Sequence, residues 1–243
     1  MNQPHLVLAH GFTQTARSWD VMCAHLAIRL DDATFSAVDL PGHGSAADER
    51  TDLWGAADHL VAHGLDGIYV GYSMGGRIAL HAALIHPGRV QALVLIGATP
   101  GIDDPTARAR RREGDEELAR RVERDGVESF VEWWLQNPLF AGLDRSAAMV
   151  EDRCRNTPAG LASSLRTVGT GTQEPLWDRL AEIDCPMLLV VGEHDEKFRA
   201  IAERMTVEAL DATLAVVPGC GHSAHLEAPD ETAGIIASWL AER

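Results

Sequence analysis

Short apolar runs that alternate with longer amphipathic stretches are the feature that most limits how this 243-residue chain can fold. Six runs are rich in Val, Ile and Leu and lack the polar alternation of a half-exposed strand. They span residues 5–9, 34–40, 67–72, 90–98, 187–193 and 213–219. Helical patterns lie between them, at 17–30, 52–63, 74–86, 196–209 and 229–242. This alternation predicts an α/β fold, in which a mostly parallel sheet of six or seven strands is covered by helices on both faces.

The alternation breaks between Pro100 and Pro175. This segment has helical periodicity but no clear strand pattern, and it includes the stretches "RARRREGDEELARRVER", "WWLQNPLF" and "NTPAGLASSLRT". The proline of the last stretch can open a helix. We expect residues 100–172 to form a helical cap, inserted into a core made of residues 1–99 and 173–243.

The formal net charge of −15 argues against a generic nucleic-acid-binding protein, which would present a basic surface. An anionic substrate would therefore need a local positive site. Arginine supplies nearly all the basic residues, and Lys197 is the only lysine.

The cysteines and the N-terminus point to a cytoplasmic protein. Four scattered cysteines without a C-x-x-C spacing are expected to be reduced and mostly buried thiols. The stretch "MNQPHLVLAHGF" enters an apolar strand directly, without the basic and apolar regions of a signal peptide. No apolar run approaches the length of a membrane span, so we expect no membrane partner.

The stretch "VGYSMGGRIAL", residues 70–80, places G-x-S-x-G between a predicted strand and a predicted helix. This is the context of a nucleophile elbow, a sharp turn that presents a reactive serine at the end of a strand. The turn brings strand and helix so close that a Cβ atom at position 71 or 75 would collide, which explains Gly71 and Gly75. The pattern predicts Ser73 as the catalytic serine.

Such a serine works with backbone N–H groups that stabilise negative charge on a substrate oxygen. The elbow aims the N–H of Met74 toward the space above Ser73. The stretch "AHGFTQ", after the first predicted strand, offers the N–H of Phe12 as a second donor. We expect Phe12 and Met74 to form the oxyanion hole.

A carboxylate should follow the serine in the chain, since the order in this kind of site is Ser, Asp, His. The stretch "VVGEHDEKF" closes a predicted strand and offers three acids. Glu193 follows the strand immediately and Glu196 starts a helix, so Asp195 is the preferred candidate.

The base should come from "VVPGCGHSAHLEAP", which closes the last predicted strand. His222 follows Gly-Cys-Gly on a tight loop that can direct its ring toward Ser73. His225 is interpreted as a supporting or helix-entry residue. Asp195 would orient His222, and His222 would accept the Ser73 proton.

Other patterns do not point to a cofactor. His59 and His63 are four residues apart on one predicted helix but have no third ligand nearby, so we interpret them as a solvated face. The loop "DLPGHG" is interpreted as structural, with His43 outside the triad order. No G-x-G-x-x-G follows a strand. We expect no metal, nucleotide or other cofactor.

With these motifs in order, the chain resembles the α/β-hydrolase superfamily over nearly its whole length. Only four residues precede the first predicted strand, so the N-terminal hairpin that often opens this fold is expected to be missing. Within the superfamily, the chain resembles the 2-succinyl-6-hydroxy-2,4-cyclohexadiene-1-carboxylate (SHCHC) synthases of menaquinone biosynthesis. The matching stretches are "HGFTQTARSW", "DLPGHGS", "GYSMGGRIAL", "ATPGI" with its arginine run, "EWWLQNPLFAGL", "GEHDEKFRAIA" and "GHSAHLEAP".

This resemblance implies a lyase that eliminates pyruvate from a small anionic precursor, a cyclohexene with several carboxylates. Ser73, deprotonated by His222, would act as a base on a carbon that a nearby carbonyl makes acidic. Arginines suit a polycarboxylate because the guanidinium is always charged and binds carboxylates through two parallel hydrogen bonds. The side chains that the resemblance assigns to the substrate are Tyr72, Arg77, Arg111, Trp134 and Arg153.

Several alternatives stay open. A serine carboxylesterase or thioesterase would use the same triad through an acyl-enzyme on Ser73, and a non-enzymatic ligand receptor could share the fold. Arg77 lies near a helix start, where the dipole disfavours a cation, so it would need an anionic partner or be a surface residue. Most of the arginines near Arg111 must be solvated, and the sequence does not decide between monomer and oligomer.

Overall fold

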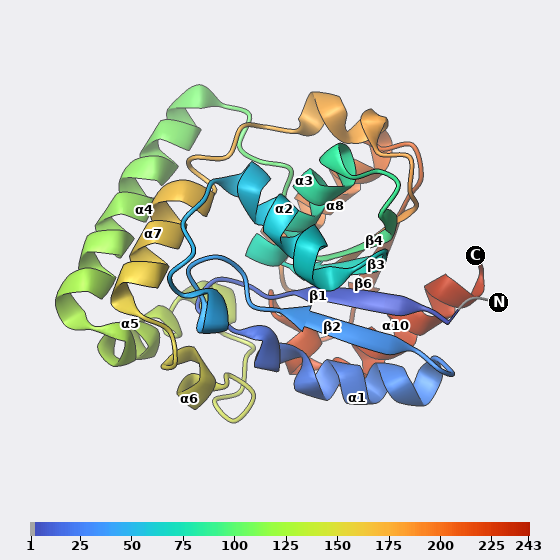
Figure 1. Cartoon of the computed structure of the whole chain (residues 1–243), viewed down its shortest axis with the longest axis horizontal. Helices are drawn as coiled ribbons and strands as arrows, with labels where there is room; N and C mark the ends of the chain where they lie inside the picture. Colours follow the sequence, from blue (N-terminus) through green and yellow to red (C-terminus); the bar gives the residue numbers. More distant parts are fainter. Residues whose placement is uncertain (1–2) are drawn as a thin grey trace.

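The computed structural model describes residues 3–243 and contains one six-stranded parallel sheet in the order β2-β1-β3-β4-β5-β6 (Figure 1). The strands are β1 (His5–Ala9), β2 (Thr34–Val38), β3 (Gly67–Tyr72), β4 (Val90–Ile96), β5 (Met187–Gly192) and β6 (Ala212–Val217). The first and last residue of each strand lie within two residues of the corresponding ends of a predicted strand. The predicted α/β fold is confirmed, with the lower of the two expected strand numbers.

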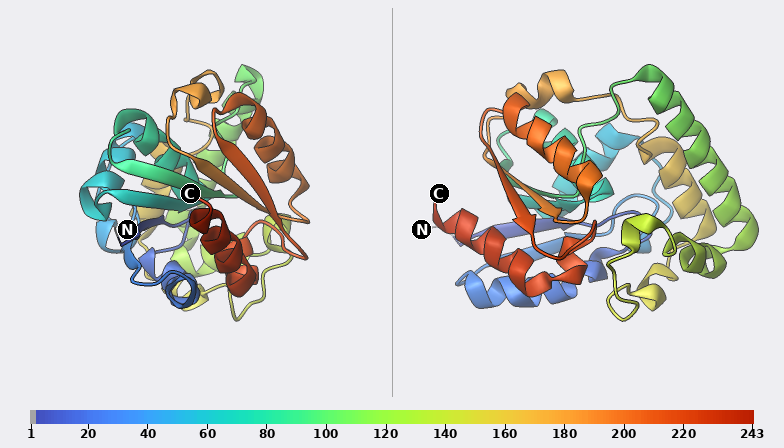
Figure 2. Two further views of the ribbon diagram at one scale, coloured as in Figure 1. Left: turned by 90° about the vertical axis from the view of Figure 1, so that its right-hand side faces the viewer. Right: turned by 180° about the vertical axis from the view of Figure 1, so that it is seen from behind.

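Helices cover both faces of the sheet (Figure 2). One face is covered by α1 (Asp20–Arg29) and α10 (Pro229–Ala241), which contact each other. The other is covered by α2 (Leu53–Gly64), α3 (Met74–Ile85) and α8 (Glu196–Glu208). Shorter elements connect them: α9 (Ala224–Glu227) and the 3-10 turns η1 (Ala16–Trp19), η2 (Gly44–Ala46) and η4 (Trp177–Glu182).

The sheet separates two apolar clusters, which explains why its strands read as continuous apolar runs. Along β1, Val7 packs into the cluster with α2 and α3, while Leu6 and Leu8 pack into the cluster with α1 and α10. All six residues of β3 and of β5 are buried. Parallel strands buried on both faces gain nothing from polar alternation.

The chain between β4 and β5 forms a helical layer at the carboxyl ends of the strands (Figure 1). Its elements are α4 (Pro105–Asp125), α5 (Val127–Trp134), η3 (Pro138–Phe140), α6 (Val150–Arg153) and α7 (Pro158–Val168). As predicted, Pro158 opens a helix, and the hydroxyl of Thr157 caps it by accepting a hydrogen bond from the Gly160 N–H at 3.0 Å.

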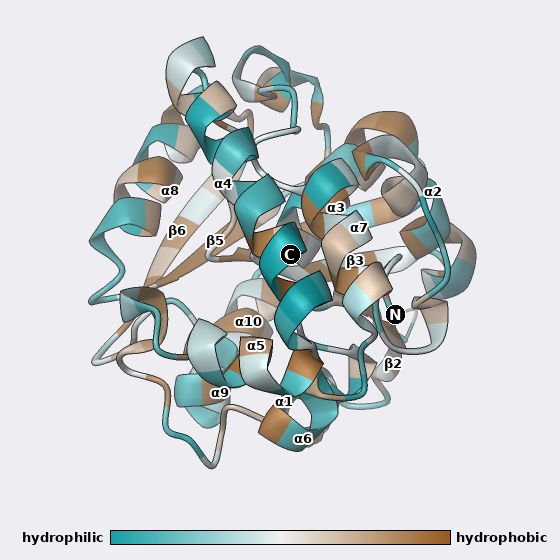
Figure 3. Ribbon diagram, turned by 90° about the vertical axis from the view of Figure 1, so that its left-hand side faces the viewer, coloured by the Kyte–Doolittle hydropathy of each residue, from teal (hydrophilic) through white to brown (hydrophobic). Residues whose placement is uncertain are grey.

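A third apolar cluster, built around Phe130 of α5 and Leu161 of α7, holds these helices together. On the surface, Arg166 of α7 pairs with Glu116 and Glu123 of α4. The outward face of α4 is strongly hydrophilic (Figure 3), as its charged sequence requires. The proposed cap boundaries, 100–172, remain a prediction.

The four cysteines are unpaired, as expected, but only Cys220 is buried; Cys23, Cys154 and Cys185 are half-buried, so the expectation that most would be buried was wrong. None of the helices within residues 3–243 is both long and apolar enough to cross a membrane.

Candidate active site

Ser73 occupies the sharp turn between β3 and α3 in a backbone conformation that few residues other than glycine adopt, with φ 50° and ψ −103°. Its N–H donates to the Ile96 carbonyl at 2.8 Å, which fixes the turn to β4. A Cβ atom on Gly75 would lie 2.0 Å from the Ala9 carbonyl oxygen, and one on Gly71 would lie 2.5 Å from the next turn's backbone. The predicted steric need for both glycines is confirmed.

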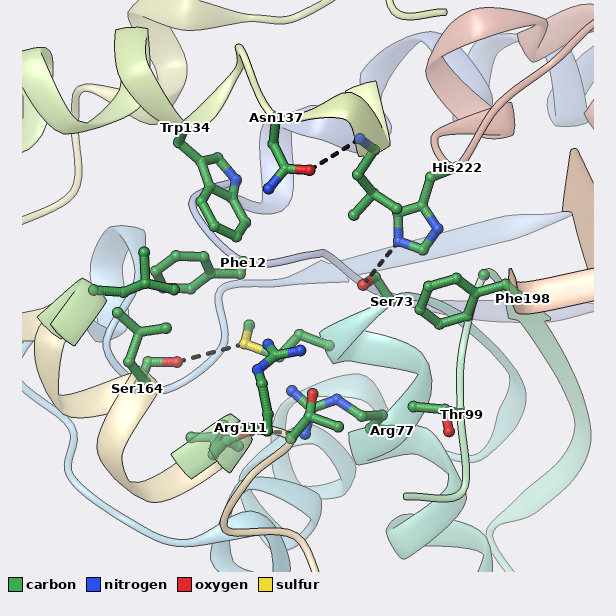
Figure 4. A pocket seen from close by; sticks show the side chains of 18 of the residues that line it. Phe12, Ser73, Arg77, Thr99, Arg111, Trp134, Asn137, Ser164, Phe198 and His222 are labelled. Atoms are coloured by element: carbon green, nitrogen blue, oxygen red, sulfur yellow. Dashed lines mark hydrogen bonds between the residues drawn. The ribbon is translucent and has the colours of Figure 1, made fainter. Parts of the chain in front are cut away.

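Ser73, His222 and Asp195 lie in one hydrogen-bonded line (Figure 4 shows the serine and the histidine). The His222 Nδ1 atom is 2.6 Å from Asp195 Oδ2, and its Nε2 atom is 3.2 Å from Ser73 Oγ. The carboxylate can only accept, so Nδ1 carries the proton and Nε2 is left to accept the serine proton. The other Asp195 oxygen accepts from the Phe198 N–H at 3.4 Å, at the start of α8.

The other acids and the second histidine lie elsewhere. Glu193 accepts a hydrogen bond from the Gly219 N–H at 2.8 Å, and Glu196 is exposed in the first turn of α8. His225 is fully buried, with its ring 4.2 Å from that of Tyr72 and 4.9 Å from that of Trp19. Of the candidates weighed from the sequence, His222 contacts Ser73 and Asp195 contacts His222.

The oxyanion hole of Phe12 and Met74 stays a prediction, and the hydrogen bonds around their N–H groups leave both groups available for it. In the turn after β1, the N–H groups of Gly11, Thr13 and Gln14 are each occupied, by Gln14 Oε1, His43 Nε2 and the Gly11 carbonyl. No partner within residues 3–243 accepts from the Phe12 N–H. Met74 is the first residue of α3, so its N–H has no partner in the helix. Both residues line the same cavity as Ser73.

That cavity, about 320 Å³, lies between the sheet edge and the helices of the cap segment. Trp134 and Asn137 lie on one side of it, and Arg77 and Arg111 lie on the other (Figure 4). Lys197 adds a third cation to its lining. The rest of the lining combines apolar side chains with the hydroxyl residues Thr99, Ser164 and Thr170. The apolar side chains are Phe12, Leu118, Leu139, Leu165, Val168 and Phe198.

Arg77 is buried, with 6% of its surface exposed, which excludes the interpretation as a surface residue. Its Nη1 donates to the Val168 carbonyl at 2.7 Å and to Gln173 Oε1 at 3.3 Å, both neutral acceptors. Burial lowers the pKa of Arg77 to about 9, and the Arg111 charge acts in the same direction, so the guanidinium stays protonated at neutral pH. No carboxylate within residues 3–243 pairs with it.

Arg111 is the member of its arginine run that reaches the cavity. It is partly exposed, and its Nε donates to Asp115 Oδ1 at 2.7 Å one helical turn away. The neighbouring Arg112 instead donates to the Gly171 carbonyl at 3.2 Å. The helix register, which the sequence left open, thus directs Arg111 inward.

Two of the predicted substrate-binding residues are not part of the cavity lining. Tyr72 lies behind His222, where its hydroxyl is 2.8 Å from Ser223 Oγ and its ring is 5.3 Å from the His222 ring. Arg153 is 1% exposed and donates to the Ala148 carbonyl at 2.7 Å and to the hydroxyl of Thr13. These contacts make both residues supports of the site, and their contact with a substrate stays a prediction.

Sequence reasoning missed several residues that shape the site. Lys197 could have been noticed as the only lysine of the chain, two residues after Asp195. Phe198 packs its ring 4.4 Å from the His222 ring. His43, interpreted as structural, holds the turn that bears Phe12 through the Thr13 N–H at 3.3 Å. That contact joins two loops 30 residues apart, so no short stretch of the sequence could have predicted it.

Four of the buried histidines lie outside the predicted triad and make this fold sensitive to acid: His10, His43, His81 and His225. Burial lowers the pKa of each, to about 4 for His10 and His81 and about 3 for His43 and His225. Because the unfolded histidine titrates near pH 6.5, below that pH the unfolded chain binds protons that the folded chain excludes. The contribution of these neutral histidines to the free energy of unfolding is therefore fully present above about pH 6.5. It is lost as the pH falls toward 4, by up to about 1.4 kcal/mol per pH unit for each histidine.

We expect the free energy of unfolding, measured with urea, to fall steadily as the pH is lowered from 7 to 5.5. The variant His225→Phe removes one titrating ring that has no hydrogen bond within residues 3–243. For this variant, the unfolding free energy should change less steeply with pH than for the wild type, by up to the slope that one proton contributes. An unfolding free energy independent of pH over this range would contradict the assignment of these histidines as neutral.

Comparison with known proteins places this site in a family. A model of the alpha/beta hydrolase family matches residues 6–235. A protein of Bacillus subtilis (strain 168), provisionally named SHCHC synthase, is 38% identical over 97% of this chain and 89% of its own length. The SHCHC synthase of Enterobacter sp. (strain 638) is 37% identical over 98% of this chain and 92% of its own. A solved structure described as MenH from S. aureus has a TM-score of 0.89 and 31% identity, covering 100% of this chain and 95% of that one. The chain belongs to the alpha/beta hydrolase family and, within it, to the SHCHC synthases.

Proposed function

We propose that this chain is a lyase that eliminates pyruvate from a cyclohexene polycarboxylate to give SHCHC, in menaquinone biosynthesis. The family supports the reaction class. One observation of the site carries the choice of substrate: Arg77 is buried at the cavity wall with only neutral hydrogen-bond partners. The nearest carboxylate, Asp115, is hydrogen-bonded to Arg111 rather than to Arg77. A buried charge without an ion-pair partner is costly, and a substrate carboxylate would compensate it.

In the proposed mechanism Ser73 acts as a base rather than as an acylating nucleophile. His222 accepts the Ser73 proton through Nε2, and Asp195 stabilises the resulting imidazolium. The serine oxygen then removes a proton from a carbon next to a carbonyl. The negative charge that develops on the carbonyl oxygen is stabilised by the N–H groups of Phe12 and Met74. Its return breaks the carbon–oxygen bond to the leaving group, which departs as the enol form of pyruvate with the proton held by His222, while Ser73 keeps the proton taken from carbon.

The substrate is held, in this proposal, by Arg77 and Arg111 through its carboxylates and by Trp134 through its ring. Tyr72 and Arg153 support the site from behind. Residues 100–172 act as the cap that closes the cavity, and the cytoplasmic location predicted from the sequence belongs to the same proposal.

A carboxylesterase or thioesterase remains the alternative, since the triad geometry alone suits acyl transfer equally well. The cavity lining argues against a neutral ester, because three cations, Arg77, Arg111 and Lys197, border it. An apolar ester would offer none of them an anionic partner, and Arg77 would keep only its neutral acceptors.

A direct assay separates the two functions. We expect the purified enzyme to release pyruvate from the cyclohexene precursor with a kcat/KM far above that for p-nitrophenyl esters, with pyruvate followed by a coupled reaction. Efficient ester cleavage without any pyruvate release would reject the lyase and favour the esterase.

A further inference from the structure

The turn after β1, residues 10–15, holds a threonine in a conformation that threonine avoids. Thr13 has φ 69°, in the left-handed region. A β-branched side chain is a genuine outlier there, and such strain persists only where the surroundings impose it. Thr13 directly follows Phe12, which lines the cavity and whose N–H has no acceptor within residues 3–243, so whatever holds Thr13 also constrains the direction of that N–H.

Every polar atom of Thr13 is held by a side chain from another part of the chain. Its N–H donates to His43 Nε2 at 3.3 Å. Its carbonyl accepts from Asn156 Nδ2 at 2.7 Å, and its hydroxyl accepts from Arg153 Nη1. Two of these three partners come from the cap segment.

Asn156 is the partner with the most specific geometry. It is 5% exposed and lies between α6 and α7, in the stretch "NTPAGLASSLRT" that the proposed mechanism does not use. Its Nδ2 also donates to the Arg153 carbonyl at 3.0 Å, and its Oδ1 accepts from the Gly44 N–H at 2.9 Å. A flipped amide would oppose all three partners, so the orientation of Asn156 is fixed.

We propose that Asn156 is a positioning residue, which acts through Thr13 to keep the Phe12 N–H directed at the substrate oxygen. This inference rests on the proposed function, because it assumes that Phe12 and Met74 stabilise the developing oxyanion. The side chain of Asn156 does not line the cavity. Its loss therefore acts on the chemical step rather than on substrate binding.

The variant Asn156→Ala is expected to lower kcat about 10- to 100-fold, less than the 10²- to 10³-fold lost with a complete oxyanion donor. KM for the anionic precursor should stay nearly constant. Asn156→Asp should behave similarly, because a carboxylate keeps the contact with the Gly44 N–H but opposes the Thr13 carbonyl.

Thr157→Ala is the matched control. Thr157 is the next residue and caps α7, so its loss should cost about 0.5–2 kcal/mol of stability without touching the turn at Thr13. We expect this variant to keep the wild-type kcat. Equal losses of kcat in Asn156→Ala and Thr157→Ala would show a general cap defect and overturn the proposal.

A second variant tests the route through Thr13. Glycine adopts the left-handed conformation at no steric cost, so Asn156→Ala should lower kcat much less in a Thr13→Gly background than in the wild type. Strictly additive losses would reject the proposal.

A readout without turnover separates this inference from the proposed function. In amide NMR spectra of the whole protein, Asn156→Ala should shift the Phe12 and Thr13 resonances and speed hydrogen exchange at Thr13. Absence of pyruvate release by the wild type would defeat the proposed function alone. Unchanged Phe12 and Thr13 resonances in Asn156→Ala would defeat the positioning role alone.

Discussion

Replacing Ser73 with alanine is expected to remove nearly all pyruvate release while leaving the fold intact. The loss should be about 10²- to 10⁴-fold in kcat, the range that a positioned general base contributes. The fold should survive because the Ser73 hydroxyl bonds only to His222 within residues 3–243, and the backbone bond to Ile96 does not involve the side chain. Steady-state kinetics and thermal unfolding of the same preparation measure both effects, with Ser238→Ala, an exposed serine on α10, as the control.

The triad also predicts how losses combine. If Ser73 and His222 transfer one proton, the double variant with Ser73→Ala and His222→Ala should be no slower than the worse single variant. A Ser73→Ala enzyme that keeps most of its activity, or losses that multiply, would mean that the two residues do not share a step.

Arg77→Ala is expected to lower kcat/KM for the anionic precursor about 10- to 150-fold, because one charge-assisted interaction contributes about 1.5–3 kcal/mol. Cleavage of small neutral esters, if any occurs, should change far less. Arg77→Lys should restore only part of the loss, since a point charge cannot replace the planar guanidinium. The measurement is kcat/KM for both substrate types in the three enzymes.

Arg77 also links α3 to the last residue of α7 and to Gln173 beyond it, so a structural effect of its removal needs a control. Its removal leaves the Val168 carbonyl without its donor, and the free energy of unfolding should fall by about 1–3 kcal/mol. Gln173→Leu breaks the second contact of Arg77 but keeps the charge. If Gln173→Leu reproduces the kinetic loss, or if Arg77→Ala slows both substrate types equally, Arg77 serves the fold alone.

The core could be predicted because its signals are local. Strands buried on both faces must be continuously apolar, and the elbow needs Gly71 and Gly75 next to the serine, so six strands and Ser73 follow from short windows. The helices of the cap segment are harder to predict from the sequence. Its α6 is only four residues long, too short for a helical period to show.

The predicted site residues also differ in whether a local sequence signal locates them. Asp195 and His222 follow strand ends, and parallel strands bring those ends to one edge of the sheet. The depth at which a side chain lies has no such local signal, so the sequence could not show that Arg153 and Tyr72 lie outside the cavity lining, and their contact with a substrate stays a prediction. The contact between Asn156 and Gly44 joins residues 112 positions apart, which only the folded chain brings together.

The three cations of the cavity sit in a chain whose net charge is −15. A polyanion approaching from bulk water thus meets repulsion at a distance and attraction only on entry. Dissolved salt weakens the first effect more than the second, because the Debye length is about 8 Å at physiological ionic strength and partly buried pairs are screened less. Encounter with the substrate should therefore quicken as salt is added up to that level, the reverse of the usual behaviour of electrostatically steered enzymes.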